Sequence, residues 1–192
     1  MYNIDEYKNE IRSRLSDYRF YHSLCVAESA KQLAEKYGAD TEKALVAGLL
    51  HDSMKESSRE EQLEYVKLAG IEMTPFEKTE KKFLHQVSGA AFAKVRFGIT
   101  DEEILGAIRY HTTGRANMTL LEEIVYLADF VSADRDYDDV DVMRAKTESS
   151  KEEGLLYCTK YTISSVVEKG KILNTDTVDT YNWILQKYFS KE

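Results

Sequence analysis

Apolar residues recur at intervals of three and four residues along most of the chain. The first two segments show this spacing at Ile4, Tyr7, Ile11 and Leu15, and at Val26, Ala30, Leu33 and Tyr37. Such a period is typical of amphipathic helices that bury one stripe of side chains. We find no convincing stretch of strict apolar and polar alternation bounded by turn residues, which a β-strand would show. The pattern therefore predicts an all-α fold with eight to ten helices.

Residues typical of helix ends stand between these periodic segments. The motif Ser/Thr-x-x-Glu satisfies free backbone N–H groups at the first turn of a helix. It occurs at Ser58/Glu61, Thr74/Glu77, Thr100/Glu103, Thr119/Glu122 and Ser150/Glu153. Gly38, Gly70 and Gly98 follow periodic segments, where a helix commonly ends in a left-handed residue. The predicted starts and stops agree with the helical period.

Length and composition describe one ordinary globular domain. The chain has 192 residues, of which 43% are hydrophobic and 31% charged, with a single proline. Its net charge of −8, from 26 basic and 34 acidic residues, argues against a protein that grips nucleic acid through a broad basic face. An anionic ligand must then be held locally.

No segment suggests a membrane or secretory destination. The longest apolar run, Ala44–Leu50, is far shorter than the roughly 20 residues that span a bilayer. The first residues lack the cationic start and apolar stretch of a signal peptide. Cys25 and Cys158 lie far apart and suggest no disulfide framework. We expect a cytoplasmic protein with no membrane partner.

Four histidines stand out because each adjoins an apolar helical segment: His22, His51, His85 and His111. A single buried histidine more often donates to a backbone carbonyl than binds a ligand. His51, however, closes the most apolar helix of the chain and is followed at once by Asp52. Adjacent helical side chains diverge by about 100°, so both reach one ion only where the helix ends.

Asp129 adds a carboxylate inside the apolar stretch 124–131. A buried carboxylate requires a cation or several hydrogen-bond donors to offset its lost hydration. Four imidazoles and two carboxylates that face inward suit a transition-metal cluster with nitrogen and oxygen ligands. Together the six residues favour a metal site over six separate packing roles.

The order His, His-Asp, His, His, Asp resembles the signature of the HD-domain metal-dependent phosphohydrolases. Within that superfamily the chain is similar to the YqeK family of bacterial enzymes, which cleave diadenosine tetraphosphate symmetrically to two ADP. The matching stretches are Tyr18-Arg-Phe-Tyr-His-Ser-Leu, Ala47-Gly-Leu-Leu-His-Asp-Ser-Met-Lys, Leu84-His-Gln-Val-Ser-Gly-Ala, Ile108-Arg-Tyr-His-Thr-Thr-Gly and Ile124-Val-Tyr-Leu-Ala-Asp. The resemblance implies a single HD-type helical bundle over residues 1–192, with the metal-site core at about 18–144 and the helices of 145–192 as scaffold.

The resemblance also implies a centre of two divalent ions, with iron as the expected metal and manganese or cobalt as alternatives. His22, His51, Asp52 and Asp129 would surround one ion, and His85 and His111 the other. Asp52 would bridge them and take part in catalysis. Two ions also suit phosphoanhydride hydrolysis on chemical grounds, because they activate water and neutralise phosphate charge. Without them, a chain of charge −8 would repel a polyphosphate.

Further residues near the motifs are candidates for contacts with a polyphosphate. Lys55 follows Asp52 by three residues and is expected to bind substrate and assist catalysis, and Arg19 and Arg135 lie near His22 and Asp129. The alternative for each is a solvated surface charge. Hydroxyls and a flexible backbone that suit a phosphate or ribose come from the run Thr112, Thr113 and Gly114, which is otherwise a simple turn.

The chain departs from the family pattern at one place, and two other functions remain open. The family's usual Glu-Pro pair is replaced here by Ser132 and Ala133. The first rival is an HD phosphohydrolase acting on another nucleotide, because the same cluster serves several substrates. The second is a module that binds a nucleotide without cleaving it. A small-molecule nucleotide is the expected partner, and an apolar face on a C-terminal helix leaves a homodimer open.

Overall fold

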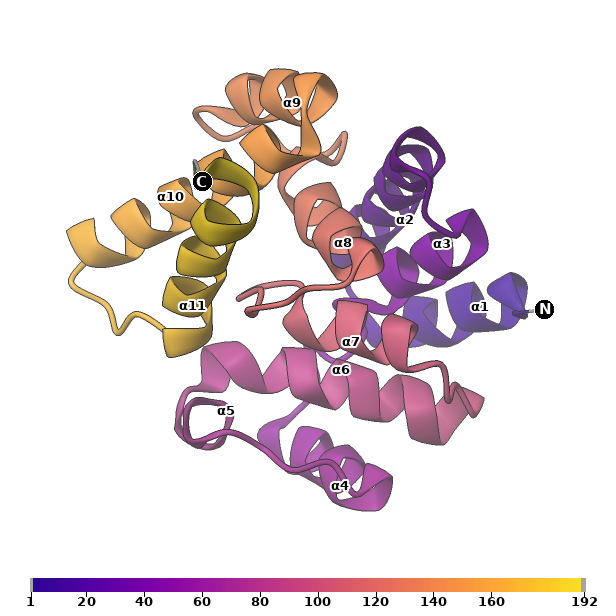
Figure 1. Ribbon diagram of the computed structural model, residues 1–192. Coiled ribbons are helices and arrows are strands. Elements are labelled where there is room, and N and C mark those ends of the chain that lie inside the picture. Colours follow the sequence, from indigo (N-terminus) through magenta and orange to yellow (C-terminus); the bar gives the residue numbers. More distant parts are fainter. Residues whose placement is uncertain (1, 191–192) are drawn as a thin grey trace.

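A computed structural model describes residues 2–190, and Figure 1 shows its arrangement. The chain forms helices throughout this range, with no strand, which confirms the all-α prediction. The helices are α1 (Ile4–Arg14), α2 (Asp17–Tyr37), α3 (Thr41–Leu50), α4 (Arg59–Ala69), α5 (Pro75–Thr79), α6 (Lys81–Phe97), α7 (Glu102–Tyr110), α8 (Leu120–Val131), α9 (Val140–Ser149), α10 (Lys151–Glu168) and α11 (Thr175–Ile184), followed by a π-helical turn, η1 (Leu185–Phe189). Residues 2–190 thus hold eleven α-helices, one more than the predicted maximum.

The buried helix α8 organises the packing. It contacts α2, α3 and α7 on one side and α9 and α10 on another. Figure 1 shows α4, α5 and α6 grouped below this centre, while α10 and α11 cover the opposite flank from α1 to α3. Eight residues of α8 are buried, from Leu121 to Ala128, because the helix is apolar on nearly all faces. The carboxyl end of α8 therefore carries Asp129 into the middle of the fold.

The capping residues were predicted well, with one error. Complete reciprocal boxes form at Thr74/Glu77 and Thr119/Glu122. At Ser58 and Ser150 only the serine side chain caps its helix. The prediction of Thr100 as a cap is wrong, because Asp101 accepts from the N–H groups of residues 103 and 104 instead. An aspartate carboxylate at this position is an equally good cap and is favoured by the helix dipole.

Close packing of α2 against α3 brings two of the histidines to the same place. A side chain at Gly48 would lie 2.9 Å from the Cα of Ala27 and 3.0 Å from the carbonyl oxygen of Val26. Only glycine permits this approach without displacing a backbone. Gly48 precedes His51 by one helical turn, so the contact sets the distance between α3's last turn and the part of α2 that carries His22.

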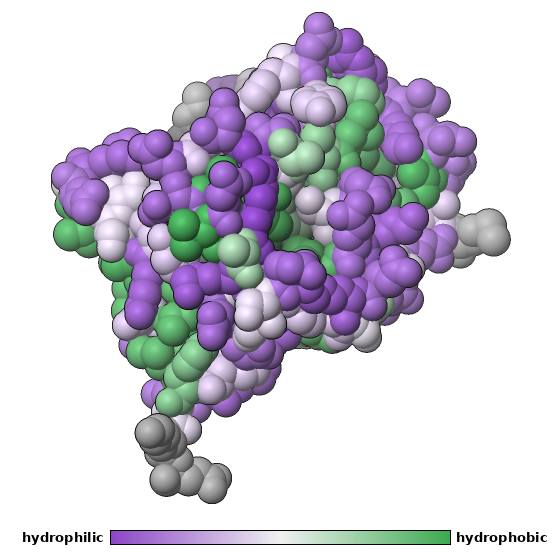
Figure 2. Space-filling model, turned by 90° about the horizontal axis from the view of Figure 1, so that it is seen from above, coloured by the Kyte–Doolittle hydropathy of each residue, from purple (hydrophilic) through white to green (hydrophobic). Residues whose placement is uncertain are grey.

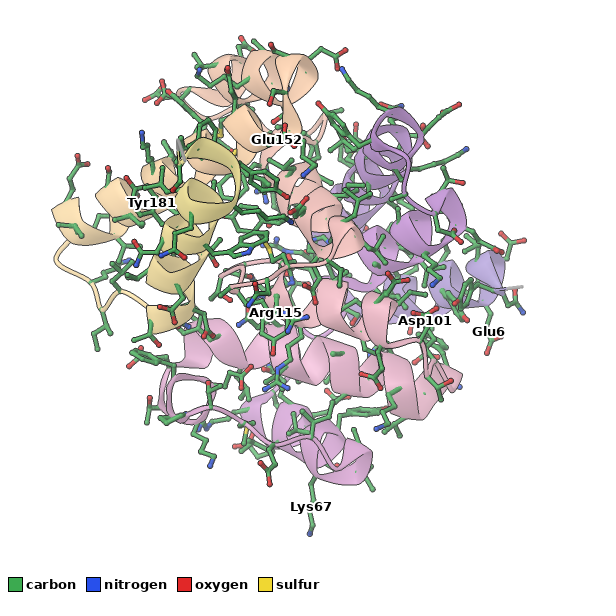
Figure 3. The ribbon with its side chains drawn as sticks, in the orientation of Figure 1. Glu6, Lys67, Asp101, Arg115, Glu152 and Tyr181 are labelled. Carbon is green, nitrogen blue, oxygen red and sulfur yellow. The ribbon has the colours of Figure 1, made fainter. Side chains whose placement is uncertain are left out.

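The outer surface is mainly hydrophilic. Figure 2 shows polar side chains over most of one face, with apolar groups in smaller patches between them. Figure 3 shows Lys67 pointing away from the molecule, whereas Arg115, on the connection between α7 and α8, lies near the middle of the view. Arg115 pairs with the buried Glu122 at 2.8 Å. None of the helices in residues 2–190 has the length and apolar character needed to cross a membrane.

Candidate metal centre

The six predicted ligands come from five separate helices and meet at one place. His22 lies on α2, His85 on α6 and Asp129 on α8, while His51 and His111 end α3 and α7 as their C-cap residues. Asp52 follows His51 in the turn that leaves α3. All four imidazoles and Asp52 are buried. The sequence separation of these residues shows that the tertiary fold, and not a local motif, assembles the cluster.

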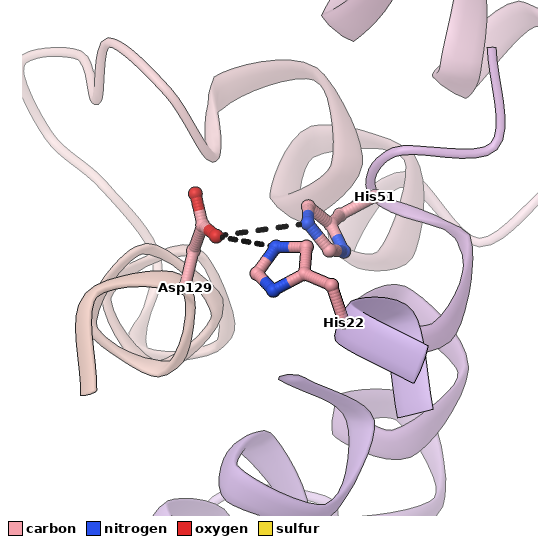
Figure 4. Close-up of side chains that lie close together, drawn as sticks. All are labelled: His22, His51 and Asp129. Atoms are coloured by element: carbon pink, nitrogen blue, oxygen red, sulfur yellow. Dashed lines mark ion pairs between the residues drawn. The ribbon is translucent and has the colours of Figure 1, made fainter. Parts of the chain in front are cut away.

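One half of the cluster is formed by His22, His51 and Asp129 (Figure 4). The Nε2 atom of His22 lies 3.0 Å from Oδ1 of Asp129, and Nε2 of His51 lies 3.7 Å from the same oxygen. The two imidazole rings meet edge to face, with their centroids 5.2 Å apart. Three donor atoms from three helices therefore converge on one small volume.

The other half is formed by His85 and His111 around Asp52. Oδ1 of Asp52 lies 3.3 Å from Nε2 of His85 and 3.5 Å from Nε2 of His111. Its second oxygen, Oδ2, lies 3.6 Å from Nε2 of His51. The two oxygens of one carboxylate thus face the two halves of the cluster, which is the arrangement that a bridging ligand requires.

The outer ring nitrogen, Nδ1, of every imidazole has a partner outside the cluster, so the inner nitrogen, Nε2, faces the cluster. Nδ1 of His51, His85 and His111 lies 2.7 to 2.8 Å from the carbonyl oxygen three residues earlier, on Gly48, Lys82 and Ile108 respectively. A carbonyl only accepts, so these Nδ1 atoms carry the proton and Nε2 keeps its lone pair. Histidines that bind a metal commonly donate their other ring N–H to a backbone carbonyl in this way.

His22 is held by a carboxylate instead, that of Asp134. The sequence did not predict a role for Asp134. Nδ1 of His22 lies 2.8 Å from Oδ2 of Asp134, and the Ser132 hydroxyl donates to Asp134 Oδ1 at 2.7 Å. Ser132 occupies one of the two positions at which the chain departs from the Glu-Pro pattern. The contact spans 112 residues, so no local spacing signalled it; the only hint was the acidic residue beside that departure.

The donor arrangement fits bound cations. Nε2 of His22 and Oδ1 of Asp129 both present lone pairs across 3.0 Å, as do the Nε2 atoms of His85 and His111 across 3.2 Å. Ligands at about 2.0–2.2 Å from one ion, 90–109° apart, are separated by roughly 3.0–3.6 Å. Nε2 of His51 and Oδ1 of Asp52 are buried without a hydrogen-bond partner in residues 2–190. A positive ion within each half would relieve both the facing lone pairs and these unpaired atoms.

Comparison with known proteins agrees with this geometry. The HD domain family matches residues 19–134, which include all six predicted ligands. The chain belongs to the HD-domain family. A protein of Bacillus subtilis named symmetrical bis(5'-nucleosyl)-tetraphosphatase is 33% identical over 91% of this chain and 94% of its own length. A Staphylococcus aureus protein of the same name is 34% identical over 94% of each chain.

A solved structure extends the likeness to the whole HD fold. It is a predicted HD superfamily hydrolase from Clostridium acetobutylicum, described as involved in NAD metabolism. It is 36% identical, has a TM-score of 0.91 and covers 97% of this chain and 99% of its own. The single-domain HD-type helical bundle predicted from the sequence is therefore confirmed.

Electrostatics keep the centre of this HD domain in the protonation state that metal binding requires. Burial lowers the pKa of His51 to about 3, and burial together with Lys55 holds that of His85 well below its usual value. Burial alone would raise the pKa of Asp52 and Asp129, but the positive charge of Lys55 beside Asp52 and of Arg135 beside Asp129 helps to hold both well below the usual range. Two histidines thus remain neutral and both carboxylates ionised.

Three predicted cations surround the centre. Nζ of Lys55 lies 2.9 Å from Nε2 of His85 and 3.4 Å from Oδ1 of Asp52. Arg19 donates to Oδ2 of Asp52 at 2.7 Å, and Arg135 pairs with Asp129 and lies 3.3 Å from Nε2 of His22. The positive charges therefore flank both halves of the cluster, with their side chains partly exposed.

Only one residue of the predicted Thr112-Thr113-Gly114 cradle lies at the centre. Thr112 Oγ1 is 3.4 Å from Nε2 of His85. Thr113 is buried, and its carbonyl accepts from Thr180 on α11. Gly114 has φ +64°, and a Cβ there would lie 2.6 Å from Thr180 Oγ1. Thr113 and Gly114 are therefore packing positions against α11 and not an open phosphate cradle.

Proposed function

We propose that this chain is a di-metal hydrolase that cleaves diadenosine tetraphosphate and related dinucleoside polyphosphates symmetrically to two nucleoside diphosphates. The observation that carries the proposal is the position of Asp52, whose two oxygens face two separate groups of histidines. Relatives that match over more than nine-tenths of the chain carry the name of this activity. The fold alone would not select a substrate.

The ligands divide as the cluster does. His22, His51, Asp52 and Asp129 would hold one divalent ion, and Asp52, His85 and His111 would hold the second. Imidazole and carboxylate donors suit iron, manganese or cobalt, and we propose iron as the native metal. When bound, two such ions supply Lewis acidity toward the phosphate oxygens and activate a water for attack on phosphorus.

The chain's own residues then hold the ions and the substrate in place. Asp52 is the catalytic carboxylate, because it fixes the relative position of the two ion sites. Lys55 is the cation nearest to the His85 half, and its ammonium binds a phosphate oxygen and offsets the charge that develops on the leaving nucleotide. With His85 engaged as a metal ligand, the Lys55 ammonium would be free to make this contact.

Arg19 and Arg135 lie beside the same site, where Arg19 donates to Asp52 and Arg135 pairs with Asp129. Each guanidinium has five N–H donors, of which the carboxylates use only some, and Nε of Arg19 has no partner in the described part of the chain. We propose that their remaining donors bind phosphate oxygens, with Thr112 as a further contact. A cytoplasmic location and a homodimer stay predictions from the sequence.

The test is the identity of the products. Metal-loaded protein is incubated anaerobically with diadenosine tetraphosphate, and the nucleotides are separated by anion exchange. We expect ADP as the sole product. AMP with ATP would contradict the symmetric cleavage, and turnover of another nucleotide with none of diadenosine tetraphosphate would support the rival HD phosphohydrolase.

Two variants make this test specific to the centre. Asp52→Asn removes the bridging charge and is expected to abolish product formation. Asp136→Asn removes the same charge from an exposed position and is expected to leave the rate unchanged. Activity that persists in Asp52→Asn would show that another site or a contaminant makes the product.

A further inference from the structure

A cavity of about 150 Å³ opens directly beside the metal centre. His111, Thr112 and Asp129 line it, so it shares a wall with both halves of the cluster. Its remaining walls come largely from the C-terminal part of the chain, which was expected to be scaffold. Thr162 and Val166 on α10, and Asn174 and Thr177 at the start of α11, line that side.

The walls suit a flat heteroaromatic ring. Phe83, Phe130 and Val166 provide apolar surface, and Thr162, Asn174 and Thr177 add polar groups among them. Pockets for complete drug-sized ligands measure about 300–1,000 Å³, so this one accommodates a single ring system. A ribose and its phosphates would remain outside, toward the metal centre.

Asn174 lines this cavity and carries a hydrogen-bond donor that the fold leaves unused. The residue is only 2% exposed, and its Oδ1 accepts from the N–H of Asp176 at 2.9 Å to cap α11. Its amide nitrogen has no partner in residues 2–190. A buried donor without an acceptor is unfavourable, and a ring nitrogen of a bound base would supply the missing acceptor.

The same side of the centre is locally basic in an otherwise acidic chain. Lys82 lines the cavity, and the charges of Lys171, Lys55 and Lys169 lie near enough to act on it. Lys55 pairs with Asp52, whereas Lys82 and Lys171 have no ion pair within residues 2–190. Unpaired like charges gathered beside a metal centre are typical of a site that takes an anion.

We propose that this cavity binds the base of one nucleoside of the substrate, with the Asn174 amide as its polar contact. The ring would lie between α6, α8 and the α10–α11 segment, and the phosphate chain would run from it past Thr112 to the cluster. The C-terminal helices would then select the nucleotide, while the HD core cleaves it. This inference rests on the proposed function for the nucleotide class, but not on the cleavage position.

The test compares two neighbouring valines on α10. Val166 lines the cavity, whereas Val167 is 61% exposed and is absent from its walls. Val166→Trp fills the cavity, and Val167→Trp adds the same side chain to the outer face of the helix. Calorimetric titration of metal-loaded protein with ADP and, separately, with inorganic pyrophosphate measures the contribution of the base apart from that of the phosphates.

We expect Val166→Trp to weaken ADP binding about tenfold, roughly the effect of losing one stacked base, and to leave pyrophosphate binding within twofold. Val167→Trp should change neither. ADP affinity that is unchanged in Val166→Trp, or an equal loss of ADP and pyrophosphate, would overturn the proposal. Binding is measured without turnover, so the two proposals can fail separately. If Val166→Trp weakens ADP binding as expected but the wild-type protein does not cleave diadenosine tetraphosphate, only the proposed activity is refuted.

Discussion

Replacement of Asp134 tests whether the carboxylate behind His22 supports metal binding. Its Oδ2 lies 2.8 Å from the Nδ1 atom of His22, which fixes the ring and increases the basicity of Nε2 toward an ion. Removal of such a supporting partner typically lowers metal affinity about 10- to 100-fold, or about 1.4–2.7 kcal/mol. Asp134→Asn keeps an acceptor oxygen but loses the charge, so we expect about tenfold. Asp134→Ala loses both and should approach a hundredfold.

The assay is competition for the metal with a chelator of known affinity, together with the metal content per chain. His22 belongs to one half of the cluster, so the affinity for one of the two ions should fall while the affinity for the other is unchanged. Ser132→Ala, which removes the hydroxyl that orients Asp134, should have a smaller effect in the same direction. Asp136→Asn serves as the charge control on the same loop. Wild-type affinity for both ions in Asp134→Ala, or an equal loss in Asp136→Asn, would refute the reasoning.

Four further changes have outcomes that follow from single contacts. Asp52→Ala should abolish turnover and lower the metal content measured by elemental analysis; full activity with full metal content would exclude the bridging role. Lys55→Ala should raise KM for diadenosine tetraphosphate about tenfold and change kcat less, which steady-state kinetics would show. Gly48→Ala places a Cβ 2.9 Å from the Cα of Ala27 and should cost about 1–3 kcal/mol in urea unfolding. Burial raises the pKa of Cys158 from 9.0 to about 12, so the folded state keeps its proton longer than the unfolded state. This group's contribution to the unfolding free energy is complete below pH 9 and should fall by up to about 1.4 kcal/mol per pH unit above it; a flat urea-stability profile there would contradict it.

Local signals predicted what depends on local interactions. The apolar period determines which face of each helix is buried, and the Thr74 and Thr119 caps form as expected because they satisfy backbone groups three residues away. Competition between neighbouring candidates caused the one wrong cap. Thr100 and Asp101 are both good caps, and the sequence alone does not rank two adjacent choices.

The sequence predicted those parts of the candidate site in which the chemistry restricts the residue type. It did not predict the parts in which tertiary packing decides which residues meet. A histidine or aspartate buried in an apolar helical segment is costly unless it has a partner, so the six candidate ligands stood out in the sequence. Asp134 was not, because an acidic residue in a loop costs nothing until the fold brings it to His22. Thr113 and Gly114 show the converse, since α11 covers them from a distant part of the chain.

The most direct test of the central claim follows the oxygen of water into the products. Metal-loaded protein hydrolyses diadenosine tetraphosphate in water enriched with oxygen-18, and mass spectrometry locates the label. The account predicts one labelled oxygen on the terminal phosphate of one of the two ADP molecules formed in each turnover, with none on an α-phosphate. Labelled AMP or labelled ATP, or an ADP pool in which no molecule carries the label, would contradict hydrolysis at the central phosphoanhydride bond.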